Sequence, residues 1–206
     1  MGLRELVMGI PWVYRSFTSA IDRPSSQRWF NENVIRARPG MRILDIGCGT
    51  AEVLSRLHGV SYFGIDHNPQ YLQRARDRFG DLARFECWDV TDTRLRDLGK
   101  FDIVFLLGVL HHLTDAQVTT MLAHAAQVLK PEGRLITLDV AIEDRQHPVA
   151  RILAKLDRGR YARSADGYGS LVGSHFKLSE VIVRHDLLRV PYTHVVITAT
   201  SVSGNA

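Results

Sequence analysis

Short β-branched apolar runs alternate along the chain with longer segments of helical period. Such alternation is typical of strand–helix–strand units that build a parallel sheet. The fourth apolar run is almost wholly apolar, as in a mid-sheet strand covered by helices on both faces. The predicted strands are residues 42–46, 61–65, 84–88, 101–107 and 134–140.

Helices are predicted between these strands from their periodicity and their ends. Asn68 and either Thr114 or Asp115 are suitable N-caps, and Pro69 suits a first helical position. The predicted helices are residues 51–58, 69–79 and 115–129, and residues 130–133 are predicted to form a turn.

The two ends of the chain carry different patterns. Residues 1–38 predict an N-terminal helical cap broken at residues 24–26, and the polar residues 143–175 predict a variable cap with helices at 149–156 and 165–172. Alternation at residues 181–190, a turn at 191–193 and a strand at 194–201 predict a hairpin, so the last strand is antiparallel. We expect one α/β domain over residues 1–206, with three layers and a doubly wound, mostly parallel seven-stranded sheet.

Composition narrows the class of protein. Apolar residues make up 45% of the 206 residues and charged residues 23%, which is ordinary for a globular domain. The net charge of +4 is spread along the chain, which argues against a nucleic-acid partner. Two cysteines, Cys48 and Cys87, make no disulfide framework. No signal peptide and no membrane-spanning apolar stretch is recognised, so we expect a soluble, cytoplasmic protein without a membrane partner.

The segment after the first strand carries a candidate ligand site. Gly47, Cys48 and Gly49 form a glycine loop two residues beyond Asp45. Glycines let the backbone turn tightly and approach a ligand. Glu52 stands where a dinucleotide fingerprint has its third glycine, and a carboxylate at Asp45 would repel a pyrophosphate but attract an ammonium group. These departures disfavour NAD.

Two more acids end the following strands. Asp66, about 20 residues beyond the glycines, can accept hydrogen bonds from both ribose hydroxyls. Asp89 and the backbone amide of Val90 could read an adenine edge. Because the carboxyl ends of parallel strands share one edge of the sheet, these acids are predicted to face a common crevice.

Together with Phe101-Asp102-Ile103-Val104, Gly108-Val109-Leu110-His111-His112-Leu113 and residues 129–135, these motifs resemble the class I S-adenosylmethionine (SAM)-dependent methyltransferases. The resemblance covers residues 42–140, about half of the chain, and implies a Rossmann-like methyltransferase fold, SAM as cofactor and a small-molecule acceptor. The end of the chain, from Arg189, is similar to that of some bacterial members. Ala51 departs from the pattern, since many members have a third glycine there.

The resemblance also implies which residues bind SAM. The glycine loop and Asp45 would face the methionine part, Asp66 the ribose, and Asp89 with Val90 the adenine. Leu107 and Gly108 would close over the cofactor near its sulfonium. The expected cofactor-binding set is Asp45, Gly47, Cys48, Gly49, Asp66, His67, Asp89, Val90, Leu107 and Gly108.

Methyl transfer from a sulfonium requires alignment and water exclusion rather than a nucleophilic side chain. A hydroxyl or protonated amine acceptor also needs a base, for which His111 and His112 are candidates. His112 is preferred, because related proteins often keep a residue there near the methyl group, although packing is an equal alternative for both. Tyr14 and Arg15 are candidates for lining the acceptor pocket, against a packing role.

Other functions remain as alternatives. A SAM-binding member without methyl transfer and an NAD-dependent oxidoreductase are kept, and base methylation is disfavoured because residues 107–110 lack the motif of such enzymes. The spacing of His175, His185 and His194 fits no zinc pattern, so no metal is predicted. Arg158, Arg160 and Arg163 are interpreted as a solvated run rather than an anion site. The acceptor, the atom methylated and the oligomeric state are not predicted.

Overall fold

A computed structural model describes residues 23–156 and 159–202 of the chain. Most of the predicted N-terminal cap, including Tyr14 and Arg15, lies outside the described residues, as does Arg158.

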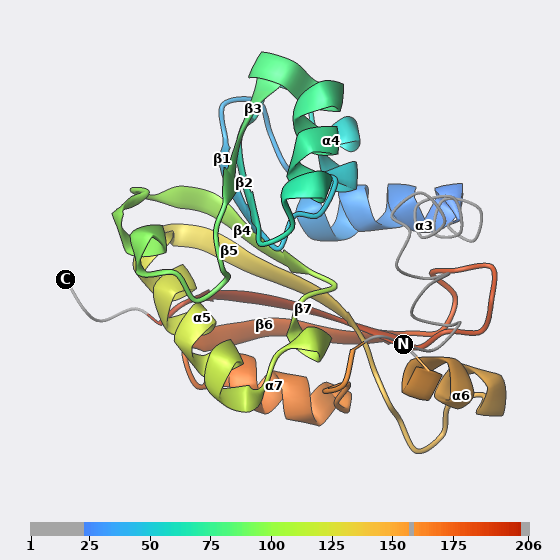
Figure 1. The fold of residues 1–206 in the computed structure, drawn as a ribbon. Coiled ribbons are helices and arrows are strands. Elements are labelled where there is room, and N and C mark those ends of the chain that lie inside the picture. The colour runs from blue at the N-terminus through green and yellow to red at the C-terminus, as the bar shows by residue number, and fades with distance from the viewer. Residues whose placement is uncertain (1–22, 157–158, 203–206) are drawn as a thin grey trace.

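The described residues form a seven-stranded sheet of order β3-β2-β1-β4-β5-β7-β6 (Figure 1). Strands β1 to β5 run parallel, and β7 lies antiparallel between β5 and β6. The prediction of a mostly parallel sheet with an antiparallel last strand is therefore confirmed. The strands are β1 (Arg42–Ile46), β2 (Ser61–Asp66), β3 (Ala83–Cys87), β4 (Phe101–Leu107), β5 (Leu129–Val140), β6 (Phe176–Arg184) and β7 (His194–Ser201).

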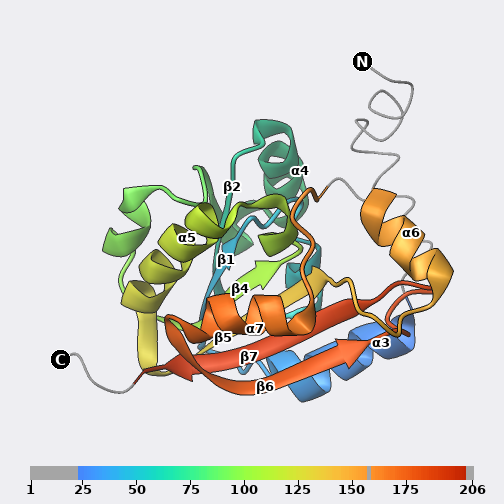
Figure 2. The same cartoon turned by 90° about the horizontal axis from the view of Figure 1, so that it is seen from below.

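Helices cover both faces of the sheet, each over its own apolar core (Figure 2). One face packs against α5 (Asp115–Val128) and α7 (Ala165–Gly173). The other packs against α4 (Pro69–Phe79) and the π-helical segment Phe30–Ile35 that continues α3 (Pro24–Trp29). These layers leave the carboxyl ends of β1 to β5 at one edge, where the chain order reverses between β1 and β4 and where α/β folds bind ligands.

The helix starts follow the predicted capping chemistry. The Asn68 side chain accepts hydrogen bonds from the amides of Gln70 and Tyr71 at the start of α4. Thr114 and Gln117 form a capping box at the start of α5, which settles Thr114 rather than Asp115 as its N-cap. Both helices therefore begin within a residue of where the sequence predicts.

Three predicted elements are wrong in detail. The helix predicted at 51–58 is only a 3-10 segment, Glu52–Arg56, because Ala51 takes a left-handed conformation with φ of 54° and the backbone is extended again by Leu57. The turn predicted at 130–133 is an irregularity within β5, after which pairing with β4 resumes at Arg134. The strand predicted at 181–190 ends at Arg184, and its second part, residues 187–190, belongs to the connection between β6 and β7.

Strand β6 instead begins at Phe176 and ends at Arg184, whose side chain pairs with Asp186 at 2.7 Å. Its first half was missed because an edge strand with polar, exposed positions such as Lys177 and Glu180 shows little apolar alternation.

The two helices of the predicted variable cap differ in their surroundings. Tyr168 and Val172 of α7 are fully buried in one core of the sheet, so α7 is part of a helical layer. Helix α6 (Pro148–Leu156) lies beyond the end of the sheet and exposes Val149 and Ile152 (Figure 1).

Candidate active site

The glycine loop folds over the end of β2. The amides of Gly47 and Cys48 both donate to the carbonyl oxygen of Ile65, at 2.8 and 2.9 Å. Gly47 has φ of +75°, and a Cβ there would lie 2.6 Å from Val109 Cγ2. Gly49 has φ of +54°, but a Cβ there would meet no atom within 4 Å. Both positions therefore favour glycine because their φ is positive. Gly47 also requires it because a Cβ would collide with Val109.

Asp66 lies at the tip of β2, directly beneath this loop. Its Oδ2 accepts from the Gly49 amide at 2.9 Å and its Oδ1 from the Asn68 amide at 2.8 Å. A carboxylate offers about four acceptor positions, so two remain for hydroxyl groups after these backbone bonds. The side chain of His67, next along, is largely exposed, with Nδ1 3.6 Å from Asp66 Oδ1.

Asp45 lies on β1 and is buried, with 2% of its surface exposed. Its Oδ2 accepts a short hydrogen bond from the Tyr62 hydroxyl, whereas Oδ1 is buried with no hydrogen-bond partner in the described part of the chain. Burial raises the pKa of Asp45 to about 7; the Tyr62 hydrogen bond lowers it and nearby Asp66 raises it. A positively charged ligand group would compensate this carboxylate.

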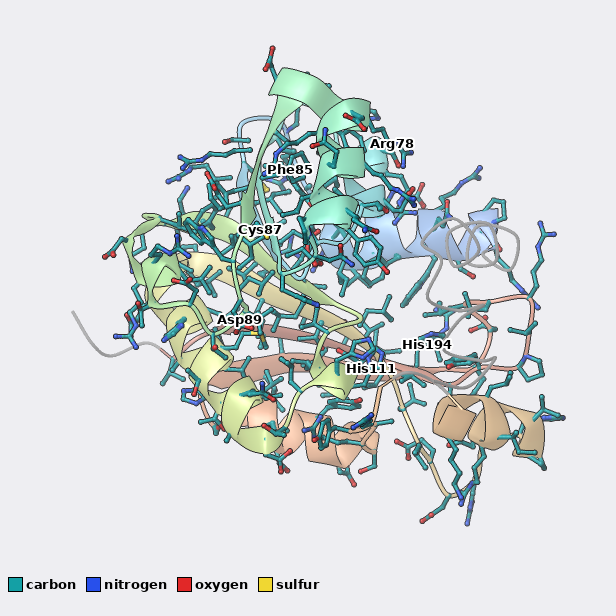
Figure 3. All side chains as sticks on the ribbon, in the orientation of Figure 1. Arg78, Phe85, Cys87, Asp89, His111 and His194 are labelled. Atoms are coloured by element: carbon teal, nitrogen blue, oxygen red, sulfur yellow. The ribbon has the colours of Figure 1, made fainter. Side chains whose placement is uncertain are left out.

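Asp89 follows β3, the next strand of the sheet, beyond Cys87 (Figure 3). Its Oδ1 accepts from the Thr91 hydroxyl at 2.6 Å and the Thr91 amide at 2.8 Å, and these bonds lower the Asp89 pKa. The side chain therefore caps a turn, the alternative to ligand contact that the sequence leaves open. It remains exposed, while its neighbour Val90 is buried.

A histidine–aspartate pair lies past the end of β4. His111 is 7% exposed, and its Nδ1 lies 2.7 Å from Oδ1 of Asp139 on β5. The His111 amide donates to the same oxygen at 3.1 Å. Asp139 is 1% exposed, and its burial raises its pKa although His111 opposes the shift.

The other edge of the His111 ring is bordered by two glycines. A Cβ at Gly108 would lie 3.9 Å from His111 Cε1, and one at Gly159 would lie 2.0 Å from Cδ2. These two carbons flank Nε2, so both glycines let the backbone pack closely against the Nε2 side of the ring. The half-buried Leu107 precedes Gly108, whose φ is +74°.

The two candidate histidines differ in burial and in hydrogen bonding. His112 is exposed, although its ring lies 4.0 Å from that of His111, centroid to centroid. Sequence reasoning preferred His112 and missed Asp139 altogether. Asp139 could have been suspected, since it is the one charged residue in the second half of the last parallel strand.

Arg163 holds the segment before α7 against this site. Its guanidinium donates to the carbonyl oxygens of Leu110 at 2.9 Å and Leu113 at 2.8 Å, and it also bonds Asp115. Arg163 is thus a structural anchor, neither an anion site nor a solvated side chain.

Other features of the described residues lie apart from this edge. A cavity of about 570 Å³ is lined by Ser61, Ala83 and Arg84 at the start of β2 and β3, opposite the carboxyl ends. No group of three metal-ligating side chains occurs among residues 23–156 and 159–202. Within the same ranges, no helix has both the length and the apolar character needed to span a bilayer.

Comparison with known proteins identifies relatives of the central segment. Residues 43–133 match a sequence family described as a methyltransferase domain. The 27-O-demethylrifamycin SV methyltransferase of Amycolatopsis mediterranei is 37% identical over 106 residues, which cover 48% of this chain and 38% of that protein. A ubiquinone biosynthesis O-methyltransferase of Bradyrhizobium diazoefficiens is 33% identical over 122 residues, 55% of this chain and 46% of that one. The chain thus spans less than half the length of these curated relatives.

A solved structure matches over nearly the whole chain. The TehB-like SAM-dependent methyltransferase from Corynebacterium glutamicum superposes with a TM-score of 0.70 over 96% of this chain and 98% of its own, at 19% identity. At 19% identity this likeness shows the fold alone. It covers more of the chain than the sequence match at residues 43–133 does.

Proposed function

We propose that the chain, whose residues 43–133 match a methyltransferase domain, is a class I SAM-dependent methyltransferase that transfers a methyl group from SAM to a hydroxyl group of a small molecule. Coupled to this, we propose that His111 is the base and Asp139 its positioning residue. The family implies SAM as cofactor. The acceptor atom and the residue roles are our proposals.

The observation that supports this function most is the set of carboxylates around the glycine loop. Asp45 has a buried oxygen without a partner, suited to the ammonium group of SAM. Asp66 keeps two acceptor positions for the ribose hydroxyls. A Cβ at Gly49 would enter open space on this side, as expected where a ligand approaches the backbone. These residues fit SAM.

SAM, when bound, supplies a methyl group on a sulfonium that is already an activated leaving group. The chain then has to align the acceptor, exclude water and take up the hydroxyl proton. With Nδ1 donating to Asp139, Nε2 is the ring nitrogen of His111 that can take up a proton. The buried carboxylate fixes this tautomer and stabilises the imidazolium that forms as the proton arrives.

A hydroxyl acceptor is favoured by the need for such a base and by the names of the curated relatives. Two of them are described as O-methyltransferases, from a ubiquinone pathway and from a fungus, Penicillium expansum. An acceptor without a proton to lose would give the pair of His111 and Asp139 no role.

The test is transfer of a labelled methyl group from SAM to a panel of phenols and aliphatic alcohols, with matched variants. His111→Ala should lower kcat by about 10² or more, the usual contribution of a general base, while leaving the affinity for SAM unchanged. His112→Ala, at the exposed neighbour, should change kcat less than about threefold.

Asp139→Asn distinguishes a positioning role from a purely structural one. The amide cannot stabilise the imidazolium, so kcat should fall and its dependence on pH should change, with the thermal midpoint lowered only slightly. Full activity of His111→Ala, or transfer to none of the hydroxyl compounds by a protein that binds SAM, would contradict the proposed reaction.

A further inference from the structure

Tyr62 makes a contact that its place in the core does not require. Its ring packs against Phe85 at 6.0 Å between centroids, in the core between the sheet and α4, where a phenylalanine would serve equally well. Its hydroxyl instead reaches Asp45 Oδ2 on the neighbouring strand. The next residue on the same face of β2 is Gly64, which pairs with Asp45 and has no side chain to block this path.

This hydrogen bond leaves the two oxygens of Asp45 in different states. Oδ2 is bound, while Oδ1 is buried and has no partner in the described residues. Among those residues no lysine or arginine pairs with Asp45 either. A buried carboxylate without a counter-charge raises the free energy of the folded state, so ionised Asp45 destabilises the apoprotein next to its glycine loop.

We propose that Tyr62 is a positioning residue for cofactor binding: its hydroxyl holds one oxygen of Asp45 and turns the other toward the ammonium group of SAM. This inference rests on the proposed function, because it needs the cofactor at the glycine loop. It adds a residue outside the loop, on β2, whose effect is exerted through Asp45 alone.

The proposal makes cofactor affinity depend on pH in a defined direction. The titratable groups that face Asp45 are Tyr62 and Asp66 from β2 and Cys48 from the loop. Burial raises the Asp45 pKa to about 7, and the Tyr62 hydrogen bond opposes the rise. Asp45 therefore gains its charge, and its attraction for an ammonium group, as pH rises through about 7. Loss of the Tyr62 hydroxyl raises the pKa further and moves this gain to higher pH.

The experiment compares two nucleosides by calorimetry between pH 6 and pH 9. S-Adenosylhomocysteine carries the ammonium group, whereas 5′-methylthioadenosine shares the adenosine part and lacks the amino acid. For the native protein, S-adenosylhomocysteine should bind more tightly as pH rises through 7. The affinity for 5′-methylthioadenosine should stay constant.

Tyr62→Phe should weaken S-adenosylhomocysteine binding at pH 7 by about 10-fold, in line with a lost hydrogen bond to a charged group, and shift its pH midpoint upward. Binding of 5′-methylthioadenosine should not change. Tyr168→Phe is the matched control, since it also removes a buried hydroxyl, one bonded to the Val140 carbonyl oxygen, and should leave both affinities as they are.

Asp45→Asn provides a second variant in case Tyr62→Phe folds poorly. It should bind S-adenosylhomocysteine weakly at every pH, with the pH dependence lost. If Tyr62→Phe binds S-adenosylhomocysteine as the native protein does, with the same midpoint, the inference is overturned while the proposed function stands. If the native protein binds neither nucleoside, the proposed function fails, and the inference with it.

Discussion

Asp66 has one structural role and one proposed binding role. Its carboxylate accepts a hydrogen bond from the Gly49 amide of the glycine loop, and we propose that it also binds the ribose. Asp66→Asn should lower the affinity for SAM by about 10-fold or more, the effect of one or two charge-assisted hydrogen bonds. Calorimetric titration measures this, with Asp77→Asn on the exposed face of α4 as control. Equal affinities of the two variants would remove Asp66 from the site.

Asp45 gives a stability prediction in the absence of any ligand. Its folded pKa of about 7 lies above its ordinary value of 3.8, so the folded protein holds a proton that the unfolded chain releases. The free energy of unfolding should therefore fall as pH rises from about 4 to about 7.

Asp45→Asn removes this titration and keeps an acceptor for Tyr62. At pH 8 the variant should be more stable than the native protein by about 1 to 3 kcal/mol, since one pKa unit corresponds to about 1.4 kcal/mol. Urea unfolding at pH 5 and pH 8 measures the difference, which should be smaller at pH 5. The stability gained by the variant over the native protein is thus expected to be larger at pH 8 than at pH 5. A smaller gain at pH 8 would show that the charge of the buried carboxylate is compensated in the apoprotein.

At the scale of elements, the glycine loop has two positions with positive φ, of which only Gly47 packs closely against another side chain. Gly49→Ala should cost about 1 to 2 kcal/mol of folding stability through its left-handed backbone alone. Gly47→Ala should cost about 1 to 3 kcal/mol more, because its Cβ would also collide with Val109. Chemical denaturation of both variants tests this order, and equal losses would mean that Val109 moves aside freely.

Arg163 supplies the side-chain hydrogen bonds that join the segment before α7 to Leu110 and Leu113, beside the backbone bond from the Tyr161 amide to the His111 carbonyl oxygen. Arg163→Ala removes the guanidinium hydrogen bonds to the carbonyl oxygens of Leu110 and Leu113, and it should lower the free energy of unfolding by about 2 to 4 kcal/mol. The exposed Arg160→Ala should change it by less than about 0.5 kcal/mol. Denaturation midpoints of the two variants provide the measurement; similar values would mean that Arg163 does not anchor this segment.

Elements with a strong local signal could be predicted from the sequence, and those set by distant contacts could not. Helices α4 and α5 were found through their caps, and β4 through its apolar run. Strand β6 was misplaced, because an exposed edge strand owes its pairing to β7 rather than to its own pattern. The 3-10 segment after the glycine loop escaped because Ala51 takes a left-handed conformation that its sequence does not signal.

The same distinction applies to the site. Asp45, Asp66 and Asp89 could be placed at one edge of the sheet because each stands at the end of a predicted strand, and the carboxyl ends of parallel strands share an edge. The contact of His111 with Asp139 joins residues 28 apart in sequence, and that of Tyr62 with Asp45 joins residues 17 apart. Each contact joins segments that are apart in the sequence, and the nearly continuous apolar runs of covered parallel strands do not show which side chains will meet.

For the whole molecule, the two cores account for where the site lies. Helices close both faces of the sheet, so the carboxyl ends of β1 to β5 are left for a ligand, with the glycine loop over β2 and His111 past β4 (Figure 3). The cofactor and the acceptor are thereby proposed to meet at the point where the strand order reverses.

The proposed cofactor site can be tested by a crystal structure with S-adenosylhomocysteine. We expect the adenosine to lie across the carboxyl ends of β1 to β3, with both ribose hydroxyls within hydrogen-bond distance of Asp66 and the ammonium group beside Asp45. A nucleoside bound elsewhere, or one at this edge that contacts neither carboxylate, would contradict it.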